Sequence, residues 1–135
     1  MDPVDLRDLL GWMALIEVRR VPDLQFHYRV FGTSLANRLG FDMTGRDGGD
    51  WPVDHLRQPQ IALFSDLVDR DEPMVGRFRV TLDTQILEVE ALMLPLGDAE
   101  AVDHVLVGVR VLRATPIRVL SQPPGYLEVG ALASA

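Results

Sequence analysis

The sequence contains no cysteine and no lysine among its 135 residues. Without cysteine it cannot form disulfides, use a thiolate nucleophile or hold an iron–sulfur cluster, and without lysine it cannot form a lysine Schiff base. It lacks a run of about eighteen apolar residues, so we expect no transmembrane helix. Its amino terminus is acidic and has no basic region of the secretory type. These features predict a cytoplasmic protein without a membrane partner.

Basic residues are also scarce, with 13 against 20 acidic residues, and the formal charge is −7. An acidic surface repels a phosphate backbone, so we expect no nucleic acid partner. Apolar residues make up 47% of the chain, which is enough for a hydrophobic core. The length fits one domain.

Alternating apolar and polar residues, separated by turn-forming residues, predict five strands. We expect these strands at residues 13–18, 26–31, 74–82, 86–94 and 102–112. Apolar residues at helical spacing predict a long helix within residues 53–70, with Pro59 in its first turn. The segment Asp71-Glu72-Pro73 should end this helix, because the residue before a proline avoids the helical conformation.

Two short helices are expected besides the long one. The first lies ahead of Gly11 and has an apolar stripe made of Leu6, Leu9 and Leu10. The second spans residues 34–39; we expect Thr33 to cap its first turn and Gly40 to end it in the left-handed conformation.

The third and fourth strands should form a hairpin with one preferred register. A loop at Asp83 and Thr84 aligns apolar residues on one face and opposite charges on the other. The expected pairs are Phe78 with Val89, Val80 with Leu87, Arg79 with Glu88 and Arg77 with Glu90. A shift by one residue would disrupt both faces.

Three segments together resemble a known family: residues 26–33 (FHYRVFGT), 43–46 (MTGR) and 87–96 (LEVEALMLPL). They resemble the PAS family, in particular a bacterial subfamily that often makes up a whole small protein. The resemblance implies an α+β fold, in which a five-stranded antiparallel sheet of order 2-1-5-4-3 carries helices on one face. It covers residues 1–112 as one domain and leaves 113–135 as a tail that is irregular or packed on the sheet.

The missing cysteine has further consequences within this family. Light-oxygen-voltage domains need a cysteine for their flavin adduct, and domains like photoactive yellow protein need one to hold their chromophore. Neither chemistry is available here. Members of the subfamily tend to carry another helical segment ahead of Asp2-Pro3, so we expect a short or absent amino-terminal cap.

Large side chains that could reach the space between helices and sheet are the candidate ligand-binding residues: Tyr28, Phe64, Phe78 and Met93. PAS domains bind flavins, haem or acids in this space, or bind nothing. A core filled by these same side chains is the alternative, and we expect no tightly held cofactor. A haem on His55 is a minor alternative, because a single histidine without defined spacing does not specify a site.

Other polar residues predict no catalytic or metal site. The three histidines are scattered, and Asp47, Asp50 and Asp54 lack the spacing of a calcium loop. Glu88 and Glu90 could form a catalytic carboxylate pair, but the predicted register places arginines opposite them.

The resemblance and the lack of catalytic residues favour a sensory or regulatory module. It would act by protein–protein interaction, with or without a small ligand, and without an output domain of its own. The alternative is a small-molecule enzyme on a cone-shaped fold like that of ketosteroid isomerase. That enzyme would need Tyr28 or Tyr126 and an aspartate converging in an apolar pocket.

We also expect a homodimer, because both faces of the strand at residues 102–112 are apolar and one of them would otherwise face water. The candidate interface residues belong to that strand and to the amino-terminal helix: Leu6, Leu9, Leu10, Leu106 and Val107. A tail folded over this face is the rival arrangement and would leave a monomer.

Overall fold

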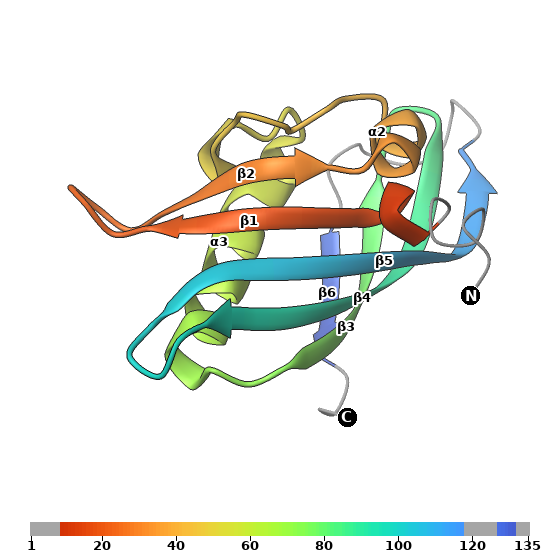
Figure 1. Ribbon diagram of the computed structural model, residues 1–135. Coiled ribbons are helices and arrows are strands. Elements are labelled where there is room, and N and C mark those ends of the chain that lie inside the picture. Colours follow the sequence, from red (N-terminus) through yellow and green to blue (C-terminus); the bar gives the residue numbers. More distant parts are fainter. Residues whose placement is uncertain (1–8, 118–126, 132–135) are drawn as a thin grey trace.

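The computed structural model describes residues 9–117 and 127–131 (Figure 1). A helical turn at residues 9–11 precedes the first strand. The elements then follow, with the labels of Figure 1, as β1 (Met13–Arg19), β2 (Gln25–Phe31), α2 (Thr33–Leu39), η1 (Gly48–Asp50), α3 (Asp54–Arg70), β3 (Met74–Thr81), β4 (Gln85–Gly97), β5 (Val102–Pro116) and β6 (Leu127–Ala131).

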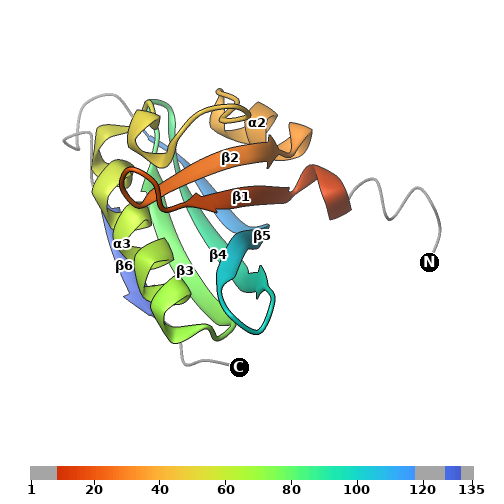
Figure 2. The same cartoon turned by 60° about the vertical axis from the view of Figure 1, so that its left-hand side comes forward.

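The strands form one antiparallel sheet in the order β2-β1-β5-β4-β3-β6. The predicted order of the first five strands, 2-1-5-4-3, is therefore confirmed. The helices cover one face of this sheet, as Figure 2 shows. The α+β fold expected from the sequence is the observed one.

We expected the segment 113–135 to be irregular or packed on the sheet, and two parts of it, residues 113–116 and 127–131, lie in strands. Strand β5 continues to Pro116, which pairs with Gln85. Strand β6 then pairs with the free edge of β3, with Phe78 opposite Val129. Part of the predicted tail is thus an edge strand of the sheet. In the order 2-1-5-4-3, one side of β3 has backbone donors and acceptors without a neighbouring strand, and β6 pairs with them.

The β3–β4 hairpin has the predicted register. Phe78 pairs with Val89, Val80 with Leu87, Arg79 with Glu88 and Arg77 with Glu90. The turn at residues 83–84 is closed by the Leu82 amide, which donates to the Gln85 carbonyl at 2.8 Å. The charged face is paired as expected, since Arg79 lies 3.2 Å from Glu88 and Arg77 lies 3.5 Å from Glu90.

The start of α2 differs from the prediction. Gly32 is the N-cap and no side chain caps the first turn, so Thr33 is the first helical residue. Gly32 donates to the Met13 carbonyl at 2.8 Å and lies so close to Gly11 that a β-carbon would clash with its backbone. This contact fixes the turn. At the other end Gly40 adopts φ 89°, the left-handed conformation predicted for it.

Helix α3 ends as predicted but begins earlier than a place for Pro59 in its first turn requires. Its first residue is Asp54, which places Pro59 inside the helix and beyond the first turn, contrary to the prediction. Asp71 ends the helix at φ 51°, with its amide donating to the Leu67 carbonyl at 2.9 Å.

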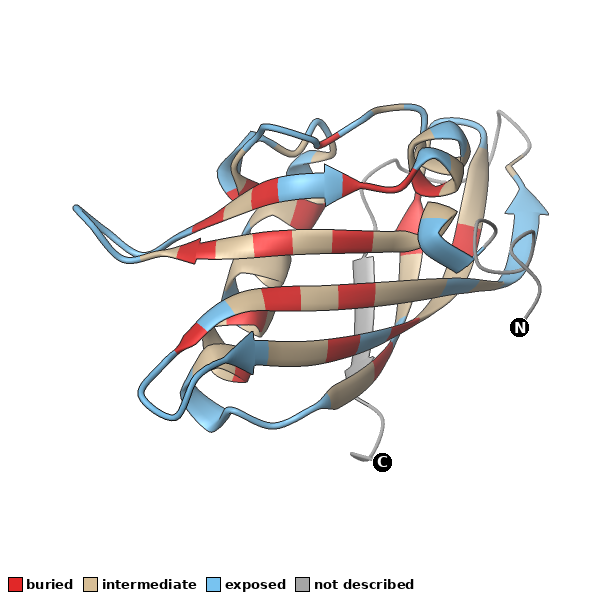
Figure 3. Ribbon diagram, in the orientation of Figure 1, coloured by how far each residue is buried: buried red, intermediate tan, exposed pale blue. Residues whose placement is uncertain are grey.

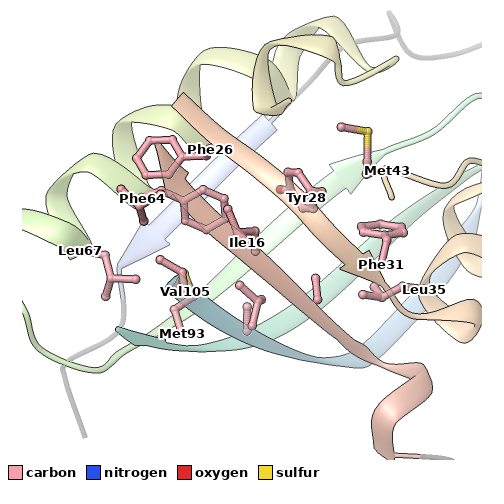
Figure 4. Close-up of a cluster of buried hydrophobic side chains, with 14 of the residues drawn as sticks. Ile16, Phe26, Tyr28, Phe31, Leu35, Met43, Phe64, Leu67, Met93 and Val105 are labelled. Atoms are coloured by element: carbon pink, nitrogen blue, oxygen red, sulfur yellow. The ribbon is translucent and has the colours of Figure 1, made fainter. Parts of the chain in front are cut away.

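The core lies between the helices and the inner face of the sheet. Buried residues alternate with less buried ones along β1 (Figure 3). The buried ones are Ala14, Ile16 and Val18. Phe26 and Phe64 meet edge to face with ring centroids 5.5 Å apart, which attaches α3 to β2 (Figure 4). Several of these core residues also line a cavity between the helices and the sheet.

Candidate functional site: an apolar cavity between helices and sheet

A cavity of about 160 Å³ lies between α2, α3 and the inner face of the sheet. Strands β1 to β5 supply its floor, and Trp12 and Trp51 also contribute to its wall. The four side chains predicted as ligand-binding all line it: Tyr28, Phe64, Phe78 and Met93. The structure thus brings these residues together around one partly open, mostly apolar space.

Residues of the wall that the sequence analysis did not name include Arg38, Gln60 and Trp51. Arg38 lies on α2 one helical turn after Leu35, and both side chains line the cavity. Spacing of three and four residues along residues 35–39 could have indicated that Arg38 shares the inward face. The local sequence pattern does not identify Gln60, because its side chain faces the cavity wall where it accepts a hydrogen bond from Tyr28, a residue distant in the sequence.

The polar atoms at the Tyr28 end of the cavity satisfy one another. The Tyr28 hydroxyl donates to Gln60 Oε1 at 2.5 Å and accepts from Trp51 Nε1 at 3.2 Å. Gln60 Nε2 donates in turn to the Gly48 carbonyl at 2.9 Å, which connects α3 to η1. Burial raises the pKa of Tyr28 well above its ordinary value. The phenol is therefore neutral at physiological pH and acts as a hydrogen-bond donor.

Aromatic packing holds Trp51 in this network. Its ring lies 5.2 Å from the ring of Phe41 and 6.3 Å from that of Phe31, both in edge-on geometry. Arg57 Nε donates to the Trp51 carbonyl at 2.6 Å. Figure 4 shows Tyr28 and Phe31 on β2 pointing to the same side of the sheet. The indole nitrogen is thereby aimed at the Tyr28 hydroxyl.

Two buried nitrogen atoms among the described residues have no hydrogen-bond partner, Arg38 Nε and His55 Nε2. Arg38 lines the cavity, whereas His55 is not among the lining residues. Burial lowers the pKa of His55, and the nearby Asp54 opposes this shift. His55, the candidate haem ligand, therefore does not face the cavity, and Arg38 is the unpaired polar group that does.

The other two histidines each pair with an aspartate, and several acidic residues pair with arginines. His27 lies 2.9 Å from Asp47, and His104 lies 2.8 Å from Asp103. Glu90 contacts both Arg77 and, at 2.9 Å, Arg110. Within the described parts of the chain no three such groups are placed to hold a metal ion, and no carboxylate lines the cavity.

The outer face of the sheet carries an apolar band, defined by Val30, Leu15, Leu106, Leu94, Met13, Leu92 and Val75. The registers place the first four in one row across β2, β1, β5 and β4, and the last three in the next row. Leu92 is 44% exposed. Ion pairs flank the band, with Glu17 between Arg19 and Arg29 on one side and Glu90 between Arg77 and Arg110 on the other.

The predicted interface residues fall on different surfaces. Leu106 belongs to the apolar band, but Val107 is only 8% exposed and lines the cavity on the opposite face. An interface on the outer face would therefore contain Leu106 and exclude Val107, because adjacent strand residues point to opposite sides. Leu9 and Leu10 are exposed ahead of β1. Leu6 lies outside the described residues.

Comparison of the chain with protein-family models, with curated proteins and with solved structures gives no match. Among the described residues, no helix combines the length and the apolar character needed to cross a bilayer.

Proposed function

We propose that this chain is a PAS-like regulatory module that binds a small, mostly apolar molecule in the cavity. The observation that carries the proposal is the cavity itself, which is lined by the residues that the family resemblance makes candidates for ligand binding. Its volume of about 160 Å³ is close to that of an engineered cavity of about 150 Å³ that binds benzene. A ligand of roughly that size fits without displacing the core.

The alternative enzyme needs an aspartate beside a tyrosine in the cavity. Tyr28 is there, but its hydroxyl already pairs with Gln60 and Trp51. No carboxylate accompanies it among the described lining residues. The geometry therefore favours binding over the acid–base chemistry of a ketosteroid isomerase-like site.

A cavity-filling variant tests ligand binding. Ala91 is buried on β4 and lines the cavity, so Ala91→Leu should occupy the space of the ligand. Ala62→Leu is the control, because it adds the same atoms on the exposed side of α3, outside the cavity. Native mass spectrometry of freshly purified protein, with and without added 2-phenylethanol, should show an adduct on the native chain and on Ala62→Leu, and none on Ala91→Leu. Equal adducts on all three chains would refute binding in the cavity.

The partner that we propose is a second copy of the chain, docked on the outer face. A two-fold axis through the apolar band would place the band against itself, with its flanking ion pairs at the rim. Light scattering should give twice the 15.1 kDa of one chain. Leu106→Asp should return the mass to that of a monomer, whereas Val21→Asp at the exposed β1–β2 turn should not. A native chain that is monomeric at micromolar concentration would refute the dimer.

A further inference from the structure

Arg38 gives the cavity one charged group in an otherwise apolar wall. Its Nε atom is buried without a partner, and among the described residues Arg38 has no ion pair or side-chain hydrogen bond. The other polar side chains of the wall are occupied by the Tyr28, Gln60 and Trp51 network. The unsatisfied hydrogen-bonding capacity of the cavity is thus concentrated in a cationic donor.

The position of Arg38 on α2 explains how the donor reaches the cavity. Leu35, Arg38 and Leu39 lie three and four residues apart, and all three line the cavity. A guanidinium in the last turn also interacts favourably with the helix dipole. That interaction requires only proximity to the helix end, as Arg70 shows at the end of α3, where its side chain is 62% exposed and bonds Asp66. It does not require the Nε atom to be buried.

A buried donor without a partner is costly, and a charged donor is more so. The group that best satisfies a guanidinium is a carboxylate, which accepts shorter and stronger hydrogen bonds than a neutral oxygen does. The cavity of about 160 Å³ leaves room for an apolar body about the size of a benzene ring. It lies below the range of about 300–1,000 Å³ that is typical for drug-sized ligands.

We propose that the cavity selects small monocarboxylates with an apolar body, and that Arg38 Nε–H donates to the ligand carboxylate. This inference rests on the proposed function, since it names the chemical class of the ligand for the same cavity. The apolar body would contact side chains such as Phe64 and Met93, while the charge remains at the α2 side. A dianion is disfavoured, because no second cationic side chain among the described residues lines the cavity.

The test compares phenylacetate with 2-phenylethanol, which share the aromatic ring and differ in charge. Trp12 and Trp51 both line the cavity and are the two tryptophans of the chain, so intrinsic fluorescence can follow binding. We expect the native chain to bind phenylacetate at least about tenfold more tightly, a difference of about 1.4 kcal/mol. Calorimetry should give the same ratio.

Arg38→Met keeps much of the side-chain length and removes the charge and the donor. It should remove the preference for phenylacetate while leaving the affinity for 2-phenylethanol within about twofold. Arg70→Met is the matched control, because it removes an arginine from the last turn of the other helix without reaching the cavity. It should leave both affinities unchanged, and circular dichroism should verify that each variant is folded. If Arg38→Met does not fold, Arg38→Gln replaces it.

The outcomes separate the two proposals. If 2-phenylethanol binds as tightly as phenylacetate to the native chain, the cavity binds ligands but the role of Arg38 is refuted. The same conclusion follows if Arg38→Met and Arg38→Gln keep the preference. If neither probe binds at millimolar concentration, binding in the cavity is refuted together with the role of Arg38.

Discussion

Replacing Tyr28 by phenylalanine should change how the stability of the protein depends on alkaline pH. The hydroxyl is buried, with Tyr28 only 3% exposed, and burial raises its pKa above the value near 10 that the unfolded chain has. A group with a raised folded-state pKa contributes stability that is complete below its unfolded pKa and is lost as pH rises toward its folded pKa. The native chain should therefore lose stability above about pH 10.

The composition leaves few other groups that titrate in this alkaline pH range. The chain has no lysine and no cysteine, so Tyr28 and Tyr126 are the side chains that titrate between about pH 9 and pH 12. Each proton that the unfolded state releases and the folded state keeps costs about 1.4 kcal/mol per pH unit. From about pH 10 to pH 11.5, Tyr28 should therefore account for a loss of about 2 kcal/mol in the free energy of unfolding.

Urea unfolding followed by circular dichroism at several pH values measures this slope. Tyr28→Phe should flatten it, while Tyr126→Phe reports the share of the other tyrosine. At neutral pH, Tyr28→Phe should cost about 1–3 kcal/mol, because Gln60 Oε1 and Trp51 Nε1 lose a partner. A double-mutant cycle with Gln60→Met should show coupling of at least about 0.5 kcal/mol. An unchanged alkaline slope in Tyr28→Phe would contradict the raised pKa.

Three further predictions follow from the fold and the core. Asp71→Gly should raise the free energy of unfolding by about 0.5–1 kcal/mol, because glycine adopts φ 51° without strain, and Asp69→Gly inside α3 should lower it. Leu92→Asp should leave a folded monomer, whereas Met93→Asp should prevent folding, since Leu92 is 44% and Met93 2% exposed; comparable melting temperatures would contradict this face assignment. The purified protein should lack the visible absorption of flavin or haem, and a Soret band that disappears in His55→Ala would overturn that expectation.

The register of the β3–β4 hairpin could be predicted because the two strands are adjacent in the sequence and carry matching residue types at the paired positions. Apolar residues at 78, 80, 87 and 89 and opposite charges at 77, 79, 88 and 90 agree on one alignment. The helix end at Asp71 was predicted for a similar reason, because the following Glu72-Pro73 acts locally. These features depend on neighbours in the sequence or on one tight turn.

Strand β6 and the start of α2 depend on contacts between distant segments. The five residues of β6 pair with an edge about fifty residues earlier, and their own pattern is too short to specify that partner. Gly32 replaces Thr33 as the cap because Gly11 and Met13 approach it, and no local pattern shows that approach. In both cases tertiary structure overrides a local expectation.

Strand β5 explains why the candidate site was only partly predictable. Its sequence is apolar on both faces, and in the structure one face lines the cavity while the other belongs to the apolar band. The assignment of Val107 to the cavity and Leu106 to the outer face required the pairing with Ala14 and Leu15 of β1, because that pairing places Val107 with the buried residues. Arg38 was missed because it lies among apolar residues, where a charge is not expected. The same contrast makes it informative, since its Nε atom is buried and has no hydrogen-bond partner among the described residues.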